Sequence, residues 1–188
     1  VFSVRAAGAA ANVPVPIAFP LPFTARYPAR DRQVVFDFDG YEQCGSPSFV
    51  AAQTLRDLTY RPPDTVRVGT IWTDSSTYLV CRDGIPMNAT VRRTFRVTGT
   101  VAEGTRTLLI VSRQSQTTLA GNGFPFGELT VVNGAGTGEL VYRIDPATGE
   151  IISAAGTATL DLSERNQLRG APRIQTAHQV AEIRIGRS

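Results

Sequence analysis

Three carboxylates in the first quarter of the chain could take part in acid–base chemistry. Asp37 and Asp39 alternate in the segment VVFDFD, and Glu42 follows them. In a strand, two residues at this spacing project from the same face. A retaining glycosidase holds two carboxylates about 5 Å apart, so a hydrolase using these three residues is one hypothesis. A polar outer strand face explains the same pattern.

Asp145 and Glu150 form a second candidate pair, in the segment RIDPATGEI. Backbone geometry explains this segment without chemistry. Asp145 suits the first position of a type I turn and Pro146 the second, while Gly149 suits the left-handed position that closes such a turn. We therefore predict a hairpin corner and assign no catalytic residue to it.

Other catalytic and cofactor sites lack their usual residues. His178 is the single histidine, and the sequence contains neither a CxxC nor a GxSxG motif. The Gly-rich segments GTGELVYRI and GNGFPFG each precede an expected strand, whereas a phosphate-binding loop precedes a helix. We expect no metal, no cofactor and no enzymatic activity.

Composition indicates one globular domain that does not bind nucleic acid. All 19 basic residues are Arg, the net charge is +3, and the Arg residues are spread along the 188 positions. No apolar run reaches the roughly 18 residues of a membrane-spanning helix.

The two cysteines, Cys44 and Cys81, predict one disulfide and an extracytoplasmic location. The chain begins at Val1 rather than Met, which is typical of a protein that has lost a targeting segment. Two independent buried thiols are the alternative interpretation.

The pattern of apolar residues predicts a mainly β domain over residues 34–188. It favours a single curved antiparallel sheet, a half-barrel or open barrel, with one short helix over 46–58. Val91, Arg93, Phe95, Val97 and Val101 should share one face of a strand. The expected strands are 34–39, 66–81, 89–101, 105–119, 126–132, 139–144, 150–162 and 174–185, with a Gly-rich turn at 133–138.

Residues 1–33 form a Pro-rich, apolar segment that we expect to be an extended arm. Its prolines exclude helix, and an extended apolar arm needs a surface to lie on, either on a partner or on its own domain. The residues predicted to bind a partner are Val13, Pro14, Pro16, Ile17, Phe19, Pro20, Leu21, Pro22, Phe23 and Tyr27.

The last long hairpin has an apolar face, and the side chains in the middle of this face are small. Small residues on a concave face leave room, either for a lipid-like ligand or for the helix over 46–58. The residues of this candidate ligand site are Ile152, Ala154, Gly156, Ala158 and Leu160.

Two patterns resemble uncharacterised secreted or lipoprotein-like bacterial β domains: VRVGTIW at 66–72 and DPATG at 145–149. Thr70 and Ile71 depart from the residues usual in the first pattern. The resemblance covers about Leu55 to Ile185, and it implies a fold similar to the lipoprotein-carrier half-barrels, with no established enzyme activity.

These observations lead to three expectations for function. The first is a non-enzymatic extracytoplasmic accessory or scaffold subunit that docks through its arm on protein subunits of a larger, membrane-embedded bacterial assembly; a photosynthetic reaction-centre and antenna complex is one example. The second is a carrier or sensor of a lipid-like ligand. The third is the carboxylate-dependent hydrolase.

Overall fold

A computed structural model describes residues 2–7, 23–26, 35–38, 63, 65–167 and 172–186. The predicted helix over 46–58 and Cys44 lie outside these ranges. The helix and the Cys44–Cys81 disulfide therefore stay predictions.

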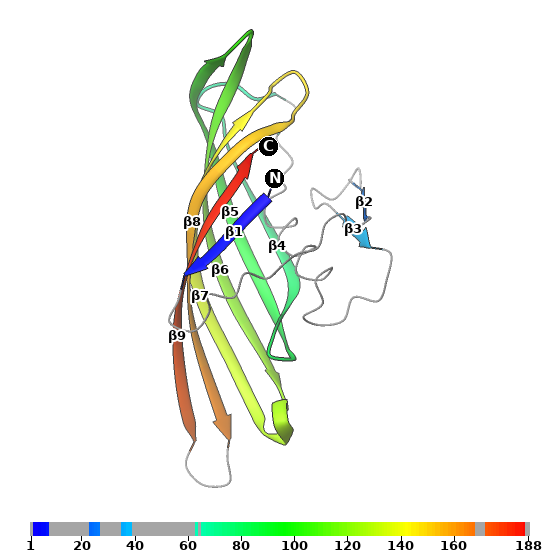
Figure 1. Cartoon of the computed structure of the whole chain (residues 1–188), viewed down its shortest axis with the longest axis vertical. Helices are drawn as coiled ribbons and strands as arrows, with labels where there is room; N and C mark the ends of the chain where they lie inside the picture. The colour runs from blue at the N-terminus through cyan, green and yellow to red at the C-terminus, as the bar shows by residue number, and fades with distance from the viewer. Residues whose placement is uncertain are drawn as a thin grey trace.

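The main part of the fold is a single curved antiparallel sheet, as predicted (Figure 1). Strands β4 to β9 follow one another as a meander, and β1 pairs with β9, which gives the order β1-β9-β8-β7-β6-β5-β4. The strands are β1 (Phe2–Ala7), β4 (Ile71–Arg82), β5 (Ile85–Glu103), β6 (Arg106–Gly123), β7 (Leu129–Ile144), β8 (Ile151–Gln167) and β9 (Arg173–Gly186). A separate two-stranded sheet pairs β2 (Phe23–Arg26) with β3 (Val35–Phe38).

Short turns fix the register of the first two hairpins of the meander. Asp83 and Gly84 both have positive φ, 49° and 79°, as a type I′ turn requires, and they join β4 to β5. Gly104, with φ of 60°, begins the two-residue turn between β5 and β6. Such turns match the right-handed twist of the strands they connect.

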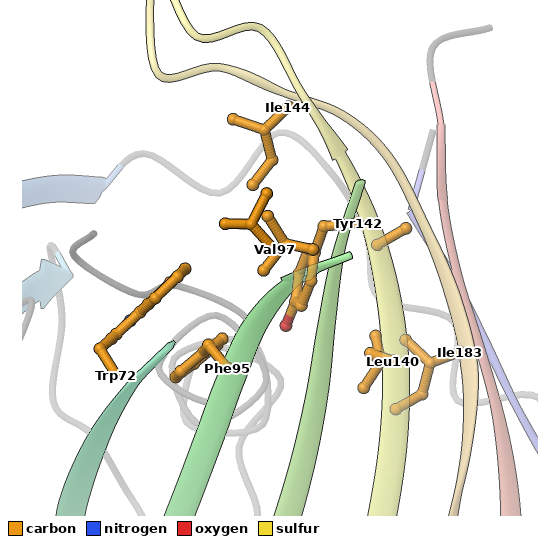
Figure 2. Close-up of a cluster of buried hydrophobic side chains, with 9 residues drawn as sticks. Trp72, Phe95, Val97, Leu140, Tyr142, Ile144 and Ile183 are labelled. Atoms are coloured by element: carbon orange, nitrogen blue, oxygen red, sulfur yellow. The ribbon is translucent and has the colours of Figure 1, made fainter. Parts of the chain in front are cut away.

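One face of the sheet carries the core. On β5, alternate residues from Ile85 to Val97 are buried and those between them are largely exposed, so the predicted face is confirmed from Val91 to Val97. Val101 lies beyond a register shift between Val97 and Gly99 and is only half-buried. Trp72 stacks on its cross-strand partner Phe95, with ring centroids 5.0 Å apart. Figure 2 shows this apolar cluster, which strands β4 to β9 all supply. A second cluster lies nearer the β4–β5 turn; its buried members are Ile85, Met87, Ala89, Leu119, Val132 and Leu162.

The buried face is strongly concave. Arg82 on β4 contacts Glu164 on β8, with 2.7 Å between Nε and Oε1, although three strands separate β4 from β8 in the sheet. In a flat sheet, four steps of about 4.8 Å would place those strands roughly 19 Å apart, near the limit for two such side chains to meet. The sheet therefore curls until its two sides face each other across the core.

The predicted Gly-rich turn at 133–138 is wrong, because β7 runs without interruption from Leu129 to Ile144. Gly134, Gly136 and Gly138 alternate along β7 and lie on the concave face. A Cβ atom added at Gly136 would collide with the carbonyl oxygen of Thr159 on β8. These glycines let neighbouring strands approach closely where the sheet curves, which is a recognised use of glycine inside a strand.

Candidate functional site

The concave face carries a group of buried polar side chains between its two apolar clusters. Arg93 on β5 has 4% of its side chain exposed and donates from Nε to Oδ1 of Asp74 on β4, at 2.6 Å. A second nitrogen of the same guanidinium donates to Oγ of Ser76 at 3.0 Å. A buried charge needs such partners because it has lost its water.

A second buried guanidinium lies one strand further on. Arg113 on β6 is 2% exposed and donates to the hydroxyl of Tyr142 on β7 at 3.1 Å. Ser115, two residues along the same face, donates to the carbonyl oxygen of Gly138 at 3.2 Å. Arg93 and Ser115 are directly paired across β5 and β6, so the two guanidiniums are diagonal neighbours.

These contacts suit a structural role better than a catalytic one. Asp74 accepts from Arg93, and Ser76 accepts from the same guanidinium, so both side chains are already held in a structural contact. Within the described part of the chain, no three His, Cys, Asp or Glu side chains come close enough together to hold a metal ion. The polar group therefore ties β4 to β5 and β6 to β7 through the core.

The predicted ligand residues on β8 mostly lie on the concave face. Ala154, Gly156, Ala158 and Leu160 pair with Tyr142, Leu140, Gly138 and Gly136 of β7. Ile152 is the extra residue of a β-bulge, because Ile151 pairs with Ile144 and Ser153 with Arg143.

The small size of Gly156 has a cause other than room for a ligand. A Cβ atom added there would collide with the carbonyl oxygen of Glu139 on β7 and lie 2.8 Å from Cα of Leu140. At Gly138, an added Cβ would lie 2.8 Å from Oγ of Ser115 and 3.3 Å from Cβ of Ala158. These positions therefore need glycine because the neighbouring strands approach too closely for a Cβ atom.

The hairpin corner at Asp145 is confirmed. Gly149 has φ of 73°, and its N–H donates to the carbonyl oxygen of Asp145 at 2.8 Å. Asp145 Oδ1 accepts from the backbone N–H of Ala147 at 2.9 Å, and Oδ2 lies 3.6 Å from a guanidinium nitrogen of Arg106. Asp145 therefore shapes the turn.

Replacing Asp145 with alanine should lower the free energy of unfolding by about 1–2 kcal/mol, because the N–H of Ala147 loses its acceptor. Asp145→Asn keeps an oxygen at the same position and should retain most of the stability. Chemical denaturation of both variants measures the difference. Equal losses would show that the Arg106 contact, and not the turn, is the main contribution of Asp145.

The other residues considered for chemistry do not come together in the described structure. His178 lies on β9, as predicted, and its Nδ1 is 2.6 Å from Oδ1 of Asp161 on β8, on the outer face. Both side chains are more than half exposed, so water competes for every contact they make. Asp37 lies on β3 opposite Thr24 of β2, while Asp39 and Glu42 are outside the described residues.

Of the predicted partner-binding residues, only Phe23 is described, as the first residue of β2. The others, from Val13 to Pro22 and Tyr27, lie outside the described ranges. The Pro-rich run nevertheless has a defined position in the chain, because it connects β1, which pairs with β9, to β2, which pairs with β3.

Several of these contacts were not predicted. In the alternating pattern of their strands, Asp74 and Arg113 both occupy positions on the otherwise apolar face. A charged residue at such a position is the signal in the sequence that could have identified them. The Arg82–Glu164 ion pair has no such signal, because it depends on how far the sheet curls.

Comparison with known proteins adds no assignment: no family model, curated protein or solved structure matches this chain. No helix within the described ranges is long and apolar enough to cross a bilayer. The resemblance to lipoprotein-like domains stays a prediction.

Proposed function

We propose that this chain is a non-enzymatic, extracytoplasmic accessory or scaffold subunit that docks on a larger, membrane-embedded bacterial assembly. The observation that carries the proposal is the state of the concave face. Its small residues are matched to neighbouring strands, and its charged groups Arg93 and Asp74 are bound to each other. A partner would then be bound by the outer face, the ends of the sheet or the segments outside the sheet.

The Pro-rich run between β1 and β2 is the best candidate for the docking segment. Proline has its φ fixed in advance, so binding in an extended form costs less conformational entropy. Each large apolar side chain buried on a partner would contribute roughly 1.5–3 kcal/mol. Phe19 and Leu21 are two such side chains, separated by Pro20.

Replacement of residues 13–22 by a Gly/Ser linker of equal length tests this docking segment. The replacement keeps β1 paired with β9 and β2 paired with β3, whereas deletion of the whole arm would remove both β1 and β2. We expect the variant to keep its unfolding midpoint while losing its partner in purification from solubilised native membranes, compared with the wild type by quantitative mass spectrometry.

Two results would contradict this proposal in different ways. A large drop in the unfolding midpoint would show that residues 13–22 belong to the protein's own core. Unchanged recovery of the partner would show that docking uses another surface. A variant with a Gly/Ser linker of equal length in place of residues 168–172, which connect β8 to β9, controls for the effect of a flexible linker as such.

A lipid-like ligand is the second candidate, favoured by the length of the apolar concave face. Two apolar clusters extend along it, one with Trp72 and Phe95 and the other with Met87 and Leu119.

A further inference from the structure

The hairpin between β6 and β7 exposes an aromatic side chain at one end of the sheet. Phe124 is 70% exposed, the highest fraction among the exposed large apolar residues of the described chain. It precedes the short 3-10 helix η1 (Pro125–Gly127), which forms the tip of the hairpin (Figure 1). With most of its surface exposed, Phe124 contributes little to the core.

Backbone hydrogen bonds and a proline restrict the conformation of this tip. The N–H of Gly127 donates to the carbonyl oxygen of Phe124 at 3.2 Å, and Gly127 takes the left-handed φ of 82°. Pro125 has its own φ fixed by its ring. Because the tip is restricted in this way, less conformational entropy is lost when Phe124 is inserted into a partner or a membrane.

The same end of the sheet carries a second exposed apolar residue and two exposed guanidinium groups. Ile174, 62% exposed on β9, pairs with the exposed Arg165 on β8. The exposed Arg173 precedes it. Of the acidic groups near this end, Asp83 and Glu164 face Arg82, at 3.6 and 2.7 Å, and Glu128 follows η1 on the hairpin.

We propose that this end of the sheet rests on a phospholipid bilayer, with Phe124 inserted at the headgroup level and Arg165 and Arg173 facing lipid phosphates. Aromatic residues and arginines at membrane interfaces occupy these positions. A hairpin tip has too little flat area for a stable protein interface of about 800 Å² per partner, but it suits shallow insertion. The proposal extends the docking function above, because it orients a subunit that binds a membrane-embedded assembly.

A tryptophan placed at the tip tests the insertion directly. In the full chain, Phe124→Trp should shift its fluorescence to shorter wavelength on addition of phosphatidylcholine–phosphatidylglycerol vesicles, and brominated lipid should quench it. Val141→Trp, at an exposed position on the outer face of β7, is the matched control and should not respond. The buried native Trp72 is common to both variants. No shift at position 124, or equal shifts in both variants, would overturn the proposal.

Vesicle co-sedimentation gives the second measurement. Phe124→Ser should weaken partition into the same vesicles by about 10- to 100-fold, the loss expected for one large apolar side chain. Its unfolding midpoint should not change, since the side chain is exposed. Unchanged partition of Phe124→Ser would overturn the bilayer contact. The contact would also be overturned if Phe124→Ser lost its protein partner while the wild type did not bind the vesicles at all. Replacement of residues 13–22 tests the docking function separately, so the two failures are distinguishable.

Discussion

Arg93→Met should lower the free energy of unfolding by about 3–5 kcal/mol, because it leaves the carboxylate of Asp74 buried without its partner. The guanidinium of Arg93 is almost fully buried, and the pair is made by a 2.6 Å charge-assisted hydrogen bond. Ser76 loses its contact as well. Chemical denaturation followed by far-UV circular dichroism measures the change.

The double variant Arg93→Met, Asp74→Leu separates the role of the charge pair from that of packing. Removing both charges also removes the uncompensated carboxylate, so the double variant should recover at least half of the stability lost. Arg93→Lys keeps a charge but cannot reproduce both contacts, and it should fall between the wild type and Arg93→Met. If Arg93→Met were as stable as the wild type, the pair would have no structural role, and Arg93 would become a candidate for binding.

Gly156→Ala is expected to destabilise the protein by about 1–3 kcal/mol, the usual range for overpacking. The added Cβ would meet the backbone of Glu139 and Leu140 on the adjacent strand, and backbone atoms cannot turn aside as a side chain can. The strands β7 and β8 would have to separate there, which weakens their hydrogen bonds.

Gly99→Ala is the matched control, because a Cβ added at Gly99 would meet nothing within 4 Å. Gly99 lies in β5, beside the register shift after Val97. Gly99→Ala should change the free energy of unfolding by less than about 1 kcal/mol. Equal stability of the wild type and Gly156→Ala would contradict the packing described here and would restore the view that Gly156 leaves space for a ligand.

Alternation and turn chemistry were enough to predict most of the sheet. The strict alternation around Arg93 placed that residue on the apolar face, and the Asp-Pro-x-x-Gly pattern at Asp145 identified a hairpin corner. Both signals depend only on residues near one another in the chain, where backbone geometry determines the structure.

The sheet was predicted to be curved, but the residues at which it curves could not be predicted in the same way. Gly134, Gly136 and Gly138 were interpreted as a turn because glycine is frequent in turns, yet they lie inside a strand whose neighbours leave no room for a Cβ. A glycine-rich segment can form a turn or lie inside a strand, and only the pairing with β8 distinguishes the two cases. The Arg82–Glu164 contact likewise exists only because the sheet curls.

The proposed function depends on a concave face that is packed by the protein itself and holds no cargo. Native mass spectrometry of the protein purified from its own cells, without denaturant, tests this most directly. We expect a single species with the mass of the bare polypeptide, and the same species after extraction with organic solvent. A reproducible added mass of a lipid, lost on extraction, would contradict the scaffold function and identify the protein as a carrier.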